Sequence, residues 1–185
     1  MTPAGTPPVH ALSGAERARR TQAHNWLLAA APHLPTAMTE WNTQGVALLT
    51  AGATWDVVRA PYALLDPAFE RTTEPDALRH RLAVLEVAGS VFCDPYRPHF
   101  YFMVPAGTDR EWPRTLGTAA VECLGGTKPY IHHVGVPRLD RAGQPGPFWL
   151  TPPDCDGPRH VNAPHLYEVL QECAARPEPV APSTP

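Results

Sequence analysis

Hydrophobic positions along the chain cluster most densely between Val91 and Pro105, where aromatic and β-branched residues surround one turn. Residues of these types favour a pleated, half-buried surface. Asp94-Pro95 and Arg97-Pro98 interrupt the run, because a proline presets a turn and lacks the backbone donor that a strand ladder needs. The pattern predicts a central β-hairpin, with His99 at the point where its second strand begins.

Three longer stretches have helical character. Ser13 and Glu16 have the spacing of a capping box and predict a helix over 13–31, which Pro32 and Pro35 should stop. A second helix should begin near Thr73 and carry leucines at helical spacing. The third should begin near residue 162 and place Leu166, Val169, Leu170 and Cys173 on one side.

Short apolar runs bounded by glycine and proline predict the remaining strands. Residues 44–50 and 55–59 should form two consecutive strands, and 119–124 should pair with 130–136 as antiparallel neighbours across a glycine turn. Residues 148–150 should add one more short strand. The side chains expected to be largely buried are Val46, Leu48, Trp55, Val57, Leu78, Leu82, Leu85, Phe100, Phe102, Val121 and Ile131.

Together these elements predict an α+β fold with a largely antiparallel or mixed β-sheet of about six or seven strands, packed by three main helices. The length of 185 residues suits one domain, which we place at 13–175. The chain has 24 prolines, and many lie near its ends, so a leader at 1–12 and a tail at 176–185 should be disordered.

Charge and composition narrow the function classes. A net charge of −3 does not indicate a protein that grips duplex nucleic acid through many phosphates. No apolar run approaches the length of a membrane span and no signal pattern opens the chain, so a cytoplasmic protein with no membrane partner is expected. The four cysteines are widely spaced, which favours free buried thiols over disulfides.

Three short segments in a shared order resemble the N-terminal domain of bifunctional DNA primase/polymerases, members of the archaeo-eukaryotic primase superfamily. Gly45 to Gly52 resembles the first glycine-rich strand of that family. Asp94 to Phe102, in which His99 precedes Phe-Tyr-Phe, resembles its turn-His-Leu-Tyr-Phe element. Val121 to Tyr130, followed by Phe148-Trp149 and Pro152-Pro153, resembles its closing segment. The resemblance covers about residues 43–153 and implies a primase/polymerase-like core.

The resemblance also implies a site. In the family, an acidic pair and a third acidic residue hold two divalent metals, and the histidine contacts nucleotide phosphates. Here His99 and Glu122 match, whereas Arg59 or Ala60 occupies the place of the acidic pair and Asp56 is shifted from it. The expectation is therefore a catalytically degenerate module with no catalytic residue, no bound metal and no cofactor. Its expected phosphate-binding residues are His99, Arg97 and Glu122, and its expected ligand is a weakly bound nucleotide or single-stranded nucleic acid.

Other interpretations remain open from the sequence. His99 can instead be a strand-edge residue hydrogen-bonded to a neighbouring carbonyl. His132 and His133 should point to opposite faces of a strand, and Cys155, His160 and His165 lack the compact spacing of a zinc site. The alternative functions are a protein-protein adaptor with no nucleotide ligand, or an enzyme whose site combines histidine, cysteine and acidic residues in an unrelated way.

Overall fold

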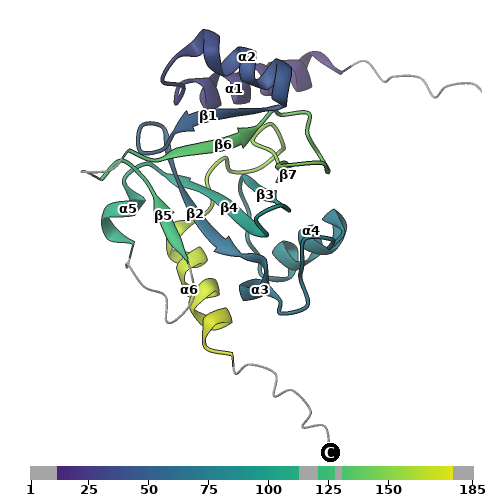
Figure 1. The fold of residues 1–185 in the computed structure, drawn as a ribbon, viewed down its shortest axis with the longest axis vertical. Helices are drawn as coiled ribbons and strands as arrows, with labels where there is room; N and C mark the ends of the chain where they lie inside the picture. Colours follow the sequence, from purple (N-terminus) through teal and green to yellow (C-terminus); the bar gives the residue numbers. More distant parts are fainter. Residues whose placement is uncertain (1–11, 113–120, 128–130, 177–185) are drawn as a thin grey trace, which may run out of the picture.

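The structure is a computed structural model that describes residues 12–112, 121–127 and 131–176. Its centre is a five-stranded antiparallel sheet in the order β5-β2-β4-β3-β7, and β1 and β6 form a separate antiparallel pair (Figure 1). The α+β class and the antiparallel sheet predicted from the sequence are confirmed. The strands are β1 (Val46–Thr50), β2 (Trp55–Pro61), β3 (Val91–Asp94), β4 (His99–Pro105), β5 (Glu122–Leu124), β6 (His133–Pro137) and β7 (Phe148–Thr151).

Helices cover the two faces of this sheet. On one face, α1 and α2 lie over the β1/β6 pair, and on the other face α3, α4 and α6 pack against the sheet (Figure 1). The short α5 lies beside β5 at one edge. The helices are α1 (Gly14–Leu28), α2 (Leu34–Gln44), α3 (Tyr62–Leu65), α4 (Pro75–Val84), α5 (Thr108–Glu111) and α6 (Ala163–Ala174).

The predicted hairpin is formed by β3 and β4, which pair from Val91 opposite Phe102 to Asp94 opposite His99. β4 then pairs along its whole length with β2, so it is a central strand with neighbours on both sides. Its even-numbered residues Phe100 and Phe102 face the α3/α4/α6 core, and Met103 faces the other core. The alternation that marked this stretch in the sequence therefore reflects burial on both faces.

Two tryptophans join the two-stranded pair to the rest of the fold. The indole Nε1 of Trp149 on β7 donates to the Pro137 carbonyl at 3.0 Å, and that of Trp41 on α2 donates to the Val136 carbonyl at 2.9 Å. Both side chains are almost fully buried. Because a buried indole N–H needs an acceptor, these bonds fix β6 between α2 and the five-stranded sheet.

The three helices predicted from the sequence are present as α1, α4 and α6, and a further helix, α2, was not predicted. α1 has the predicted capping box, with the Glu16 backbone N–H donating to the Ser13 hydroxyl and the Glu16 carboxylate accepting from the Ser13 N–H. α4 and α6 begin near the predicted residues. α2 was not predicted, because Pro35 was interpreted as a stop, whereas it lies in the first turn of α2, where the missing N–H costs no hydrogen bond.

Two strand predictions were wrong. The strands predicted at 119–124 and 130–136 do not pair where the structure describes them, because β5 pairs with β2 and β6 pairs with β1. Leu48 and Ile131 are exposed, at 54% and 69%, rather than buried. On β1 the buried residues are Ala47 and Leu49, one position away from those expected, and Ile131 precedes β6. Val46 and Leu85 are half-buried, and the other side chains in the expected core are buried.

The predicted leader and tail lie almost entirely outside the described residues. Within the described part of the chain, no helix has both the length and the apolar character that are needed to cross a membrane.

Candidate functional site

A row of polar side chains crosses three strands of the five-stranded sheet. Arg59 on β2 stands opposite Glu122 on β5 and opposite Tyr101 on β4. His99 lies two residues before Tyr101 and pairs with Asp94 on β3. Directly opposed residues, and residues two apart on one strand, share a face of a sheet. These five residues therefore lie on one face, and we call them the Arg59 cluster.

The same face is apolar further along the strands. Trp55, Val57 and Met103 are fully buried there and belong to the core formed with α1, α2, β1 and β6. At the Arg59 end the side chains are only partly covered: the Arg59 side chain is 31% exposed and that of Glu122 is 54% exposed. The layer formed by α1, α2, β1 and β6 therefore covers only the Trp55 end of this face. The Arg59 end stays partly open to solvent, which suits polar side chains.

Arg59 forms an ion pair with Glu122. Its Nη2 donates to the Glu122 Oε2 at 2.7 Å, the length expected for a charge-assisted bond. The Arg59 guanidinium also lies beside the Tyr101 hydroxyl. Burial raises the pKa of Tyr101, the positive charges of Arg59 and Arg97 oppose that rise, and the Asp94 carboxylate adds to it. Two guanidinium groups thus lie close to one phenol hydroxyl.

His99 has one ring nitrogen engaged and one available. Its Nδ1 lies 3.0 Å from the Arg97 backbone carbonyl oxygen. A carbonyl oxygen only accepts, so Nδ1 carries the proton and donates. This confirms the interpretation of His99 as a strand-edge residue bonded to a neighbouring carbonyl. Phosphate contact through Nε2 stays a prediction, since Nε2 can donate only when the ring is protonated.

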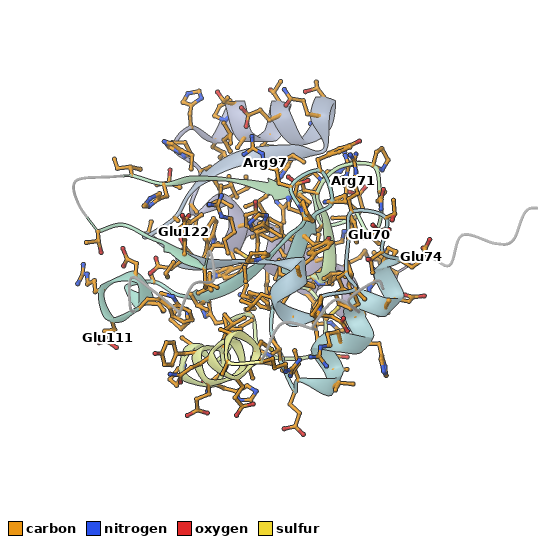
Figure 2. All side chains as sticks on the ribbon, turned by 60° about the horizontal axis from the view of Figure 1, so that its bottom comes forward. Glu70, Arg71, Glu74, Arg97, Glu111 and Glu122 are labelled. Atoms are coloured by element: carbon orange, nitrogen blue, oxygen red, sulfur yellow. The ribbon has the colours of Figure 1, made fainter. Side chains whose placement is uncertain are left out.

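The β3–β4 turn adds an aromatic and basic rim to the cluster. Tyr96 is 62% exposed, and the Arg71 guanidinium carbon lies 5.9 Å from the centre of its ring. The Asp94 Oδ1 accepts from the Tyr96 backbone N–H at 3.0 Å, which fixes the turn. Arg97 is exposed on the same turn and lies between Glu122 and Arg71 in the view of Figure 2.

The structure therefore brings the three residues predicted from the sequence into one region. His99 and Glu122 share a sheet face with β2 between them, and Arg97 lies in the adjoining turn. Sequence reasoning missed the two residues that connect them, Arg59 and Tyr101. A signal for Arg59 exists in the sequence: in Trp55-x-Val57-x-Arg59 a period of two places an arginine in line with core residues.

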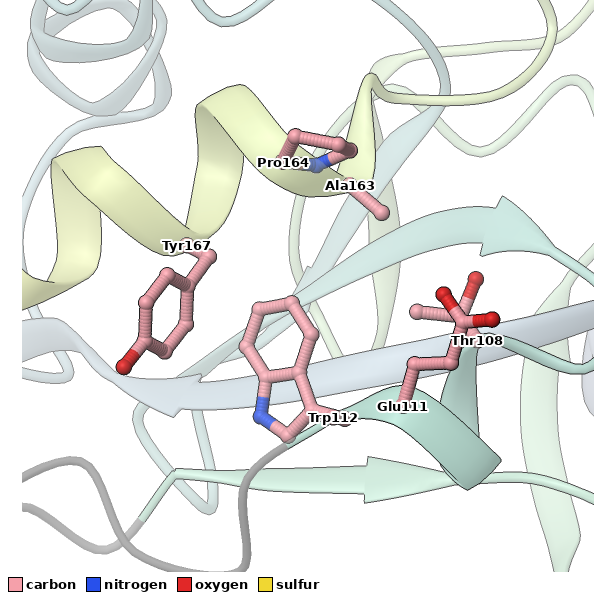
Figure 3. Close-up of a pocket in the computed structure, with 6 residues that line it drawn as sticks. All are labelled: Thr108, Glu111, Trp112, Ala163, Pro164 and Tyr167. Carbon is pink, nitrogen blue, oxygen red and sulfur yellow. The ribbon is translucent and has the colours of Figure 1, made fainter.

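A separate cavity of about 400 Å³ opens between α5 and the first turn of α6 (Figure 3). The Trp112 and Tyr167 rings meet edge to face at 5.7 Å and form its wall, and both pack against the core on the face of the sheet opposite the Arg59 cluster. Glu111 gives one side of the cavity an acidic rim. It is lined by Thr108, Glu111, Trp112, Ala163, Pro164 and Tyr167.

The thiols are not arranged for nucleophilic catalysis. Burial raises the pKa of Cys93 to about 12 and also raises that of Cys123, as predicted for packed thiols. The expectation of buried thiols is met by Cys93 and Cys173, whereas Cys123 is half-buried and Cys155, in a turn after β7, is exposed. Among the described residues no group of three or more histidine, cysteine or acidic side chains could hold a metal ion.

The comparisons with known proteins leave the interpretation to the geometry alone. No family model matches the chain, and no curated protein or solved structure matches it either.

Proposed function

We propose that the protein is a non-catalytic binding module, a degenerate relative of the primase/polymerase domain, whose Arg59 cluster and β3–β4 turn bind the phosphate of a nucleotide or of single-stranded nucleic acid. The observation that carries this proposal is the convergence of Arg59, Arg97, Tyr101 and His99 at the open end of one sheet face. Guanidinium groups match phosphate geometry and remain charged at all relevant pH values.

The Arg59–Glu122 ion pair supports binding without catalysis. In the family that the sequence resembles, the carboxylate at the place of Glu122 helps to hold a divalent metal. Here that carboxylate is neutralised by an arginine of the same chain at 2.7 Å. A fixed guanidinium can attract a phosphate group, but it cannot activate a nucleophile as a two-metal centre does.

The exposed rim at the β3–β4 turn supplies an aromatic surface on which a nucleobase can stack. Tyr96 offers a ring that is 62% exposed, with Arg71 over it and Arg97 next to it in the chain. Sequence-independent binding of single strands combines a basic groove with aromatic rings on which bases stack. Glu122 and Asp94 oppose an anion, so we expect modest affinity, with dissociation constants of roughly 0.1–1 mM.

The proposal is tested by titrating the isotope-labelled protein with inorganic phosphate, ATP, GTP and a short oligothymidylate while amide shifts are recorded. The expected perturbations centre on residues 94–102 and on Arg59. They should be abolished by His99→Ala or Arg97→Ala and strengthened by Glu122→Gln, which removes a repelling charge and frees Arg59. Arg17→Ala serves as the control, because it removes an exposed arginine of α1 that lies on another part of the molecule.

Three outcomes would contradict the proposal. Silence at residues 94–102 with all four ligands would show that the cluster is only structural. Equal loss of binding in Arg17→Ala and Arg97→Ala would show that the ligands respond to net charge alone. Template-dependent incorporation of labelled nucleotide with Mg²⁺ or Mn²⁺, absent from a Glu122→Gln control, would show that the module is catalytic after all.

A protein-protein adaptor is the second candidate, and one observation favours it. Leu34 and Met38 are 49% and 43% exposed and stand one helical turn apart on α2. Contiguous exposed apolar groups are typical of interaction surfaces. Under this alternative, the ligand titrations leave residues 94–102 unchanged.

A further inference from the structure

Asp56, which is fully buried, and Asp109, which is partly buried, form a carboxyl pair outside the Arg59 cluster. Asp56 lies on β2 but points to the opposite face from Arg59, since the two are three residues apart on a strand. Its side chain is fully buried. Its Oδ2 accepts from the Asp109 backbone N–H at 2.9 Å, and the backbone N–H of Gly107 also points toward this carboxyl.

The two carboxyl groups adjoin, because the Asp56 Oδ2 is held by the backbone N–H of Asp109, and each one affects the protonation of the other. The Asp109 Oδ2 accepts from the Thr127 backbone N–H at 2.7 Å. Each carboxyl keeps a second oxygen, the Oδ1 of Asp56 and the Oδ1 of Asp109, that is buried and accepts from no donor of the protein. A buried carboxylate oxygen without a donor is costly, and two adjoining carboxylates both in the charged form would repel each other.

Glycines allow this close approach. A side chain at Gly125 would overlap the Asp109 carboxyl, and one at Gly52 would overlap the backbone of Gly126. The carboxyl pair therefore joins three segments that are far apart in sequence: β2, α5, and the turn after β5 at 125–127. The segment that Asp109 holds also carries Thr108, Glu111 and Trp112, which line the 400 Å³ cavity.

We propose that Asp56 and Asp109 share one proton, and that this proton is a pH-sensitive latch that holds α5 and the 125–127 turn against β2. With the proton present, one carboxyl donates to the other and both orphan oxygens are accounted for. With the proton lost, the buried charge of Asp56 adjoins the charge of Asp109, and α5 together with the Trp112 wall of the cavity is released from its tight position.

A proton fits this site better than a divalent cation does. Mg²⁺ and Ca²⁺ take about six to eight oxygen ligands, and the pair offers only two carboxyl groups. No third metal-ligating side chain joins them among the residues that the structure describes. The guanidinium of Arg110, which favours the charged form of Asp109, already brings a positive charge to the outer side of the pair.

The surroundings favour one particular proton distribution. Burial raises the pKa of Asp56 to about 6, and the Asp109 charge contributes to that rise. The pKa of Asp109 is lowered, since its bonds to Thr127 and Asp56 and the charge of Arg110 together outweigh burial. Among the residues that the structure describes, the Cys123 thiol of β5 also lies close to the pair and stays neutral, and the Nδ1 of His132 bonds to the carbonyl of Gly125, which adjoins Asp109.

The test follows the carboxyl ¹³C resonances of Asp56 and Asp109 in the wild-type chain from pH 3 to 8. We expect Asp56 to titrate near pH 6, which corresponds to proton binding about a hundredfold tighter than in a free aspartate. The amides of 107–111 and 127 and the Trp112 indole resonance should shift with the same midpoint. Asp56→Asn, whose amide can donate permanently, should abolish these shifts, while Asp76→Asn, at an exposed position of α4, should leave them unchanged.

Three results would overturn the latch. The first is a midpoint for Asp56 near 4, and the second is a titration of Asp56 that leaves the amides of 107–111 unmoved. The third is a midpoint that depends on added Mg²⁺, Ca²⁺ or EDTA, because that would assign the pair to a cation. These measurements use the wild-type chain, so they decide the question even if Asp56→Asn fails to fold. They are also independent of any phosphate ligand at the Arg59 cluster.

Discussion

The Asp56 side chain should make the stability of the protein fall as the pH rises, an effect that Asp56→Asn isolates. Its pKa is raised from 3.8 in a free aspartate to about 6 in the fold. A group with a raised folded-state pKa contributes stability that is fully present below the unfolded pKa and is lost as the pH rises through the folded pKa. The difference of about two pKa units corresponds to about 3 kcal/mol, of which about 2 kcal/mol should be lost between pH 4.5 and 7.5.

Other groups change stability with the opposite sign, among them Asp109 and His160. The pKa of Asp109 is lowered, so its contribution is lost only as the pH falls below that of a free aspartate. His160 also has a lowered pKa because it is partly buried, and its contribution grows as the pH rises through about 6.5. The total stability of the wild type can therefore change little with pH even though Asp56 contributes strongly.

The assay is urea unfolding of the wild type, Asp56→Asn and Asp76→Asn at pH 4.5 and 7.5, followed by tryptophan fluorescence and far-UV circular dichroism. The wild type should lose about 2 kcal/mol relative to Asp56→Asn over this interval, and Asp76→Asn should follow the wild type. A wild-type advantage over Asp56→Asn that stays constant within about 0.5 kcal/mol would refute the reasoning, because the Asp56 proton would then be bound equally in the folded and unfolded states.

Two further predictions concern the core and the thiols. Leu82→Ala, at a position that is 3% exposed on α4, should lower the free energy of unfolding by about 2–4 kcal/mol. Leu48→Ala, at an exposed position of β1, should change it by less than about 0.5 kcal/mol. Equal losses of stability in urea unfolding would contradict the burial of Leu82. In the native protein, the exposed Cys155 should react with a thiol reagent well before the buried Cys93 and Cys173. Peptide mapping of the modified chain would identify the thiol that reacts first. Modification of all three thiols at the same rate would contradict the packing of Cys93 and Cys173.

The sequence was sufficient for the elements whose patterns are local. The β3–β4 hairpin, the α1 capping box and the α6 stripe each depend on neighbouring residues, and all three are present in the structure. The pairing of β1 with β6 joins Val46 to Pro137, so it depends on contacts that no window of neighbouring residues contains. The α2 helix was missed for a different reason, because a proline early in a helix and a proline that stops one look alike without the backbone geometry.

The candidate site shows the same limit. His99 and Glu122 were proposed through a family resemblance and Arg97 through its place in the preceding turn, but the contacts of Arg59 and Tyr101 that join them depend on strand register. Tyr101 and Glu122 flank Arg59 on different strands, and the Asp56–Asp109 pair spans 53 positions. Strand register and a buried carboxyl contact are tertiary properties, which explains why the element types were predicted more completely than the chemistry between them.

β2 places a charged or ionisable side chain on each face of the sheet, and each one is matched by a partner from another strand or loop. Arg59 on one face is neutralised by Glu122 of β5, and Asp56 on the other face adjoins Asp109 of α5. The two sites differ in whether a ligand from solution can reach the β2 side chain. Glu122 is half exposed, so a phosphate from solution can compete with it for Arg59. Asp56 is closed to solvent, so its charge can change only by the gain or loss of a proton. The first arrangement suits a ligand site of modest affinity, and the second suits a switch that responds to pH.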